Sequence, residues 1–202
     1  MKNLIDNRYF QELSEATPND ICRNAGCKYN KDTKTYSMIV WGDEFIINPA
    51  EKTIKNVSGN FIIHDYFALF IIYYLLNAKE TIMQNEWISE KDIPGGATFF
   101  RGPHEIPTSW ISDKFNNRLS YFKLICEKTG GIELKKADAA FYFLITPRLP
   151  ISLLFWDGDE DFPPEAKIMY DKSIVAVLSL DIVFALAVAI CDRIGKAESE
   201  KE

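Results

Sequence analysis

Apolar and polar positions alternate along the chain with two different periods, and each period predicts one kind of secondary structure. Over residues 4–16 the apolar side chains follow helical spacing, which predicts a first helix. The stretch "TYSMIVWGDEFIIN" alternates with a period of two and breaks at Gly42 and Asp43, so we predict a hairpin with a two-residue turn at this pair. The residues "KTIKNV", 52–57, add a third short strand.

The middle of the chain predicts two further helices separated by a long loop. Residues 61–78 are apolar nearly all round, which places this helix at the centre of the fold. Residues 89–108 are rich in proline and glycine, so no long regular element is expected there. From 109 to 128 the apolar residues recur every three or four positions, which predicts one amphipathic helix that ends before Gly130.

The C-terminal third predicts three consecutive strands and a last helix. Short links join the strands 139–145, 151–156 and 166–171, which indicates an antiparallel meander. Its first two strands are apolar on both faces, so we expect helices on one side and another layer on the other. The apolar run 174–191 divides at Ser179 into a short β-rich piece and a helix of about 15 residues.

These elements predict an α+β fold in which an antiparallel sheet packs with about four helices. The sheet would comprise the N-terminal hairpin and the C-terminal three-strand meander. We expect a single domain over residues 1–195, followed by a polar, disordered tail over 196–202.

Composition and charge restrict the partners of the protein. The 202 residues are 47% hydrophobic, which is enough to form one buried core without disulfides or structural metal ions. The chain has 29 acidic and 23 scattered basic residues and a net charge of −6, so we expect no nucleic-acid partner. We also expect no membrane partner, because the run 61–76 is too short to span a bilayer and Asp181 interrupts the second apolar run. Four cysteines without a signal peptide favour a reduced, cytoplasmic location.

The sequence lacks the residues and motifs that several common enzyme classes require. With His64 and His104 as the only histidines, neither a zinc helix of the HExxH type nor a three-histidine cage can be built. The chain also contains no GxSxG, GxxxxGK[ST] or GxGxxG motif. The sequence therefore requires no cofactor, and it leaves open whether the protein is an enzyme.

Two histidines are weak candidates for catalysis. His64 lies in the apolar helix, where a core or helix-start role is favoured over that of a general base beside Asp65. His104 lies in the proline- and glycine-rich loop and is the better catalytic candidate, although it also fits a purely structural role in the loop.

The acidic turn "WDGDEDFPP", 156–164, is a candidate cation site. Asp157, Asp159 and Asp161 have the first spacing of a calcium loop, but the glycine and glutamate that an EF-hand requires are missing. A looser magnesium or calcium site would combine these aspartates with Asp171. The alternative is a solvated hairpin connection that turns at Gly158 and is stiffened by Pro163 and Pro164. Arg101 or Arg148 would then compete with a cation to neutralise its charge.

Cys22 and Cys27 form a C-x4-C pair. A zinc or iron–sulfur site needs about four ligands, and the other candidates lie far off in the sequence. The alternative is a pair of small buried residues at a passage from helix to strand.

One family shares the most distinctive stretches of the chain. "LPISLLFWDGDEDFPPEAKIMYD", "WISEKDIPGG" and "LSLDIVFALAVAI" together resemble the bacterial and archaeal domain of unknown function 3786 family, over roughly residues 5–195. The family has no established activity. Some similar proteins carry an added iron–sulfur domain and are associated with corrinoid and one-carbon metabolism in anaerobes, so the resemblance implies a link to that metabolism.

Two functional hypotheses follow. The first is a non-catalytic accessory domain that binds a small molecule or a protein through the 94–107 loop and the 156–164 turn, because both connections carry aromatic and charged residues. The predicted binding surface comprises Phe99, Phe100, Arg101, Arg148 and Trp156. The second is a metal-dependent hydrolase that uses the acidic turn, with His104 as acid or base.

Overall fold

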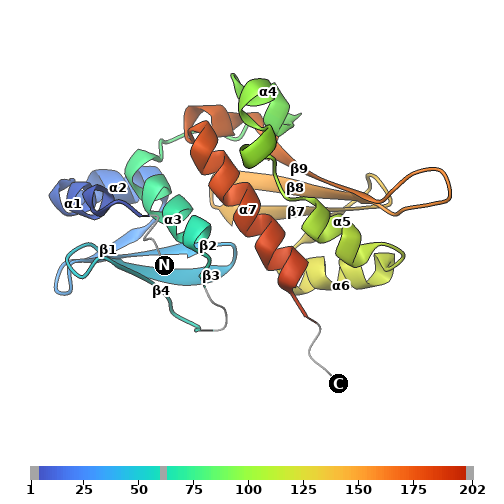
Figure 1. Ribbon diagram of the computed structural model, residues 1–202. Helices are drawn as coiled ribbons and strands as arrows, with labels where there is room; N and C mark the ends of the chain where they lie inside the picture. Colours follow the sequence, from blue (N-terminus) through green and yellow to red (C-terminus); the bar gives the residue numbers. More distant parts are fainter. Residues whose placement is uncertain (1–4, 60–62, 199–202) are drawn as a thin grey trace.

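A computed structural model describes residues 5–59 and 63–198 and contains two antiparallel sheets (Figure 1). The N-terminal sheet has the strand order β1-β2-β3-β4, and the C-terminal sheet has the order β5-β9-β8-β7-β6. The strands are β1 (Lys28–Asn30), β2 (Thr35–Val40), β3 (Asp43–Asn48), β4 (Thr53–Asn56), β5 (Trp87–Ile88), β6 (Ile132–Leu134), β7 (Ala139–Thr146), β8 (Leu149–Trp156) and β9 (Glu165–Asp171). The α+β class with antiparallel pairing is confirmed, but the strands form two sheets rather than one.

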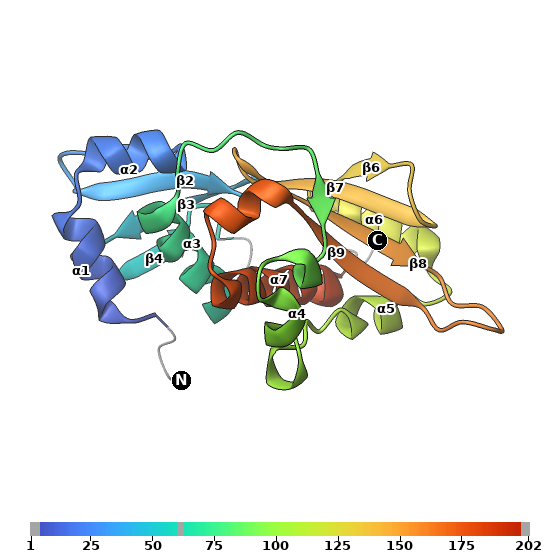
Figure 2. The ribbon, with the colours of Figure 1, turned by 90° about the horizontal axis from the view of Figure 1, so that it is seen from above.

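Two long helices connect the sheets. Helices α3 and α7 lie side by side between the N-terminal and C-terminal sheets, as Figures 1 and 2 both show. Within the described residues there are seven α-helices, more than the four expected: α1 (Asn7–Glu15), α2 (Pro18–Ala25), α3 (Asp65–Asn77), α4 (Gly96–Phe99), α5 (Ser109–Phe115), α6 (Leu119–Lys128) and α7 (Leu180–Lys196). Three short 3-10 turns accompany them: η1 (Glu90–Asp92), η2 (Gly102–His104) and η3 (Lys172–Ala176).

A second helix that was not predicted follows the first one. The helix expected over 4–16 is α1, which ends at Glu15, and Pro18 is then the first residue of α2. Proline fits this position because the first helical N–H needs no partner. Gly26 then ends α2 with a φ of 68°, in the left-handed region where glycine has no Cβ penalty.

The N-terminal sheet follows its alternating pattern. Tyr36, Met38 and Val40 are buried and face the helices, whereas Ile39 on the other face is 51% exposed. The predicted hairpin is present, but its turn is one residue earlier than expected: Val40 pairs with Asp43, and Trp41 and Gly42 form the turn. Both turn residues have positive φ, 49° for Trp41 and 79° for Gly42. A tryptophan at positive φ is strained, so tertiary contacts must hold it there.

The C-terminal sheet contains the predicted meander of β7, β8 and β9. The short edge strands β5 and β6 were not predicted. One face, which carries Phe141 and Phe155, packs against Phe122 of α6 with ring-centre distances of 5.9 and 4.7 Å. Among the described residues the other face is covered only in part: Ala140 and Ser152 on it are buried, whereas Leu144 is 44% exposed.

Two predicted segments have a different conformation. The helix expected over 109–128 is divided into α5 and α6 at Asn117, which has a φ of 57°. Its backbone N–H donates to the Asp157 carboxylate at 2.6 Å, so a contact distant in sequence holds the break. The β-rich piece expected near 174 is instead η3, which begins beside the Asp171 carboxylate.

The last helix begins after Ser179, as predicted, and extends to Lys196. It therefore includes the first residue of the expected tail, whose residues 199–202 lie outside the described part, as does the predicted helix start at 61–62. In the described residues, no helix is long and apolar enough to cross a membrane.

Candidate functional site

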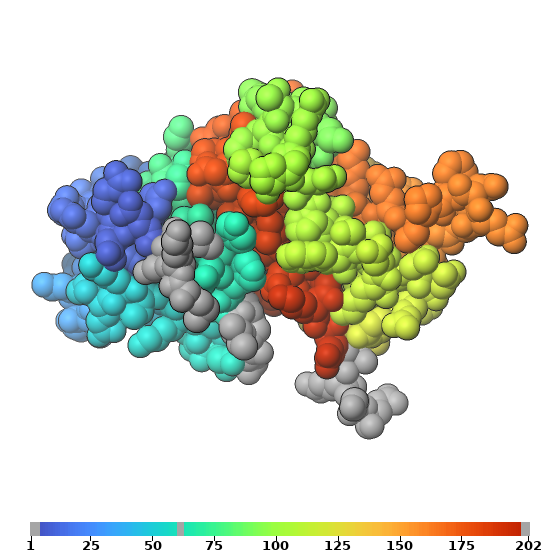
Figure 3. All heavy atoms as spheres, viewed as in Figure 1, coloured from blue at the N-terminus to red at the C-terminus, as the bar shows by residue number. Residues whose placement is uncertain are grey.

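The strained turn between β2 and β3 forms one wall of a hollow where the two sheets meet. This junction hollow has a volume of about 360 Å³. In Figure 3 the outline of the molecule is indented between the N-terminal part and the C-terminal end of α7. Its lining includes Trp41, His64, Phe67, Ala189, Arg193 and Lys196.

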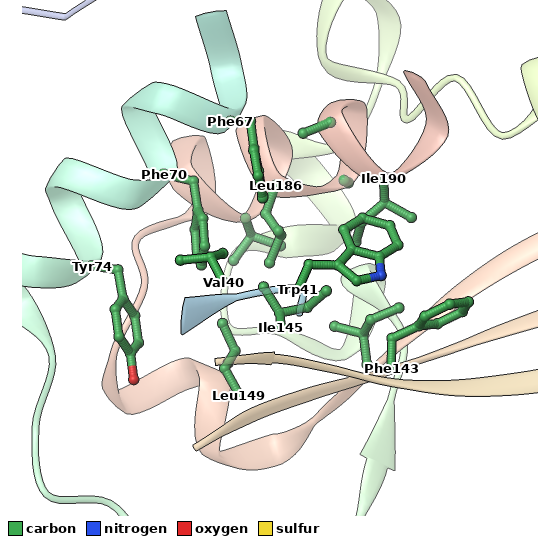
Figure 4. Packing of buried hydrophobic residues seen from close by; sticks show 14 of the residues in the cluster. Val40, Trp41, Phe67, Phe70, Tyr74, Phe143, Ile145, Leu149, Leu186 and Ile190 are labelled. Carbon is green, nitrogen blue, oxygen red and sulfur yellow. The ribbon is translucent and has the colours of Figure 1, made fainter. Parts of the chain in front are cut away.

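Trp41 is fixed by hydrogen bonds to two other elements. Its backbone N–H donates to the Ile145 carbonyl of β7 at 2.7 Å, and its Nε1 donates to the Thr129 carbonyl after α6 at 2.9 Å. The indole also packs edge-on against Phe143, with 5.3 Å between the ring centres. Figure 4 shows the ring between Phe143 and Ile190. These contacts join the two sheets and oppose the cost of the positive φ at Trp41.

Two ion pairs lie along the α7 side of the hollow. The Arg193 guanidinium carbon lies 4.6 Å from the centre of the Trp41 ring, and Nη2 donates to Asp43 at 2.9 Å. Burial lowers the pKa of Arg193, while Asp43 opposes the shift, and an arginine stays charged in either case. One turn further on, Lys196 pairs with Asp192.

His64 supplies an imidazole on the α3 side. Its Nδ1 accepts from the Tyr66 backbone N–H at 3.2 Å, so the ring caps the N-terminus of α3. This confirms the helix-start role favoured by the sequence. Because Nδ1 is an acceptor, the neutral ring carries its proton on Nε2. That atom takes part in no hydrogen bond among the described residues, so it is available to a molecule in the hollow.

The walls of the junction hollow are largely apolar. They are mainly the surfaces of Trp41, Phe67 and Ala189. Thr129 is the only hydroxyl residue among the described lining residues, and its Oγ1 donates to the Ile125 and Cys126 carbonyls at 2.9 and 3.0 Å. An activated nucleophile needs an adjacent base, and this hydroxyl proton is already donated to helix carbonyls.

The structure divides the binding surface predicted from the sequence. Phe99 and Phe100 lie together, with ring centres 5.1 Å apart, and Arg101 follows them as an exposed residue at the start of η2. Arg148 and Trp156 lie at opposite ends of β8. Nη1 of Arg148 donates to the Asn24 carbonyl at 2.8 Å, at the end of α2.

The 94–107 loop does reach the strand that follows the acidic turn. Phe100 and Ile106 line a second hollow of about 300 Å³ together with Glu165 and Lys167 of β9. Charged side chains of both signs occur in its lining. A binding role for this surface stays a prediction.

The acidic turn uses its carboxylates to hold the chain. Asp159 Oδ1 accepts from the backbone N–H groups of Asp161 and Phe162 at 2.9 and 2.8 Å, and Asp157 accepts from Asn117. Backbone donors, rather than Arg101 or Arg148, thus meet these two carboxylates. A cation site at this turn stays a prediction.

Asp171 lies at the other end of β9 from the turn. Burial alone would raise the pKa of its carboxylate, but hydrogen bonds from Ser173, Gln84 and Asn85 outweigh that effect and lower it. The three backbone N–H groups donate at 2.9, 3.0 and 2.6 Å. In the described part of the chain, no three acidic, histidine or cysteine residues form a cluster that could hold a metal ion.

His104 is held between two aromatic rings. It stacks on Phe99 at 4.4 Å and meets Phe184 edge-on at 5.5 Å. Its side chain forms no hydrogen bond to a carboxylate within the described residues, which would be the usual way to orient a general base. Its catalytic role remains a prediction.

The residues of the junction hollow were missed in the sequence. His64 was considered as a general base, a core residue or a helix-start residue, but not as part of a binding site, and Arg193 and Lys196 were not singled out. One signal was present: the dipeptide Trp41-Gly42 places a large aromatic residue at a hairpin turn, where positive φ favours glycine or asparagine.

Comparisons with known proteins give a family but no function. The family model described as domain of unknown function (DUF3786) matches residues 17–193. No curated protein matches the chain. No solved structure matches it either.

Proposed function

The chain belongs to the DUF3786 family of unknown function, and we propose that this member is a non-catalytic binding domain whose ligand occupies the junction hollow. The observation that carries the proposal is Trp41, held at positive φ by two other elements so that it forms one wall of an apolar hollow. Backbone strain persists only where the surroundings impose it, and it often occurs at ligand sites.

The lining determines the kind of ligand. A flat apolar body fits between Trp41, Phe67 and Ala189. Among the described lining residues the polar groups are mostly donors: Nε2 of His64 and the cations Arg193 and Lys196, which pair with Asp43 and Asp192. We therefore infer a small organic acid, with its carboxylate toward the end of α7.

The size of the hollow bears on the metabolic link implied by the family. Its volume of about 360 Å³ lies near the lower end of the range of small-molecule sites, about 300 to 1,000 Å³. A macrocycle such as a corrinoid is too large for it. We therefore propose that any connection with corrinoid or one-carbon metabolism concerns an associated protein or metabolite rather than the occupant of this site.

The test uses matched probes and a variant that fills the hollow. 2-Naphthoate and its neutral counterpart 2-naphthamide are titrated into the 15N-labelled protein, and the indole N–H signal of Trp41 is followed by NMR. We expect saturable shifts, and tighter binding of the acid than of the amide. Ala189→Phe places a ring in the hollow and should abolish the shifts.

Ala176→Phe is the control, because it adds the same ring at an exposed position of η3. It should leave the binding unchanged. Equal binding by the wild type and Ala189→Phe would contradict the proposal, as would naphthoate shifts confined to the other three tryptophans.

A further inference from the structure

The two N-terminal cysteines lie next to each other at the end of α2. The Cys27 thiol donates to the Cys22 sulfur, with 3.6 Å between the two sulfurs. Both side chains are half-buried, whereas Cys126 and Cys191 are fully buried. From this geometry we propose that Cys22 and Cys27 form a reversible disulfide by exchange with a low-molecular-weight disulfide.

The end of the helix brings the sulfurs together. Gly26, with a φ of 68°, reverses the chain, and the N–H groups of Gly26 and Cys27 both donate to the Cys22 carbonyl, at 3.0 and 3.3 Å. In this type of helix end the residues at the positions of Cys22 and Cys27 commonly make an apolar contact. Here that contact is between two thiols. The corresponding sequence signal is cysteine, three residues, glycine and cysteine.

Only a small movement separates the dithiol from the disulfide. A disulfide has a sulfur–sulfur distance of about 2.05 Å, so the sulfurs at 3.6 Å must approach by about 1.6 Å. Side-chain rotation and a slight shift of the glycine turn are enough for such a change. Burial and the adjacent Cys22 raise the pKa of Cys27, so this residue is an uncharged thiol at neutral pH and we expect Cys22 to react first.

The exchange proceeds in two balanced steps. The Cys22 thiolate attacks one sulfur of oxidised glutathione, the sulfur–sulfur bond of the oxidant breaks, and one glutathione thiolate leaves. Cys27 then loses its proton to solvent and attacks the Cys22 sulfur of the mixed disulfide, which releases the second glutathione. The protein loses two electrons and two protons, and the oxidant is reduced to two thiols.

The disulfide would close a segment that touches the C-terminal sheet. Asn24 lies between the two cysteines, and its carbonyl accepts the hydrogen bond from Arg148 in the β7–β8 turn. The bond would thus fix the point where this turn is attached to α2. Oxidation or reduction of the pair would therefore alter how firmly α2 is held to the C-terminal sheet.

The test is oxidation of the full chain at varied ratios of oxidised to reduced glutathione, followed by acid quenching, alkylation and tryptic mass spectrometry. Trypsin cleaves after Arg23, so the cysteines fall in different peptides, 9–23 and 24–28. We expect these peptides to become linked as the ratio rises, with a mass lower by two hydrogens than their sum. Cys126 and Cys191 serve as internal controls and should be alkylated throughout, after denaturation.

Single variants test the order of the steps. In Cys27→Ser the glutathione adduct should persist on Cys22, because the second sulfur is absent, whereas in the wild type it should be replaced by the internal bond. A wild type that keeps the adduct, or whose peptides stay separate at every ratio, would overturn the proposal. This outcome leaves the ligand proposal unaffected, because no residue of the junction hollow takes part.

Discussion

Arg193 and Trp41 form a stacked pair across the joint between the two sheets. The guanidinium carbon lies 4.6 Å from the centre of the indole ring, and the same guanidinium binds Asp43 at 2.9 Å. One side chain of α7 therefore contacts both ends of the strained turn. The Arg193 and Asp43 side chains are each 21% exposed, so water screens their pair only in part.

Arg193→Ala should lower the free energy of unfolding by about 2 kcal/mol, between the values for exposed and buried ion pairs. Part of this loss is the cation–π contact, and part is the Asp43 carboxylate left half-buried without its cation. Urea unfolding at neutral pH measures the change. Arg23→Ala is the matched control, because the Arg23 and Asp20 side chains of its ion pair are 62% and 55% exposed, and it should cost less than about 0.5 kcal/mol. Equal effects of the two variants would refute a special role for the stacked pair.

Asp171→Asn should make the free energy of unfolding less dependent on pH in the acidic range. Because hydrogen bonds hold the folded pKa of Asp171 below the usual 3.8, the carboxylate stabilises the fold above that value, and this contribution is lost as the pH falls through the folded pKa. We expect a cost of about 2 kcal/mol at pH 7, since charged hydrogen bonds are lost and an amide group faces backbone donors. The difference from the wild type should shrink toward pH 3.

Urea unfolding at the two pH values tests this prediction. Asp113→Asn, at an exposed position of α5, is the control and should leave the stability nearly unchanged at pH 7. A difference between Asp171→Asn and the wild type that stayed constant down to pH 3 would show that the three hydrogen bonds do not favour the ionised form.

Gly96→Ala should disrupt the contact between α4 and η1. A Cβ at Gly96 would lie 2.0 Å from the Glu90 carbonyl oxygen, and a backbone atom cannot rotate away as a side chain can. We expect a loss of about 3 kcal/mol in unfolding free energy. Amide hydrogen exchange should accelerate locally over residues 89–100.

Gly102→Ala separates the steric effect from backbone strain. Gly102 has a φ of 56°, and a Cβ there would meet nothing within 4 Å, so only the left-handed conformation costs energy, about 1 kcal/mol. If the two variants lost equal stability, the close approach at Gly96 would not be the cause.

Local patterns in the sequence were enough to predict most of the fold. The alternation at Tyr36, Met38 and Val40 depends on one buried face, and Ser179 precedes its helix as a capping residue should. The break at Asn117 could not be predicted, because the hydrogen bond that holds it comes from Asp157, 40 residues away. The two-sheet arrangement also depends on a distant contact, from Trp41 to Ile145.

The candidate sites were harder to predict for the same reason. Chemistry was expected where unusual residues cluster in the sequence, as in the acidic turn, but Asp159 uses its carboxylate to close its own loop. The junction hollow gathers Trp41, His64 and Arg193 from three elements distant in sequence. The cysteine pair, by contrast, is a local motif whose own sulfur–sulfur contact supports the proposed chemistry.

Trp41→Phe tests whether the indole joins the sheets. The variant removes the hydrogen bond to the Thr129 carbonyl and leaves a smaller ring in the same space, so we expect a loss of about 2 kcal/mol in unfolding free energy. Trp41 is 4% exposed, so its removal should shift the remaining fluorescence to longer wavelength. Trp110→Phe is the control: Trp110 is 45% exposed, and its loss should shift emission the other way at a cost of less than about 0.5 kcal/mol. If Trp41→Phe matched this control in stability, the Nε1 bond would not support the joint, and the strain at residue 41 would have to be held by its backbone bond to Ile145 and by its ring contacts with Phe143 and Arg193.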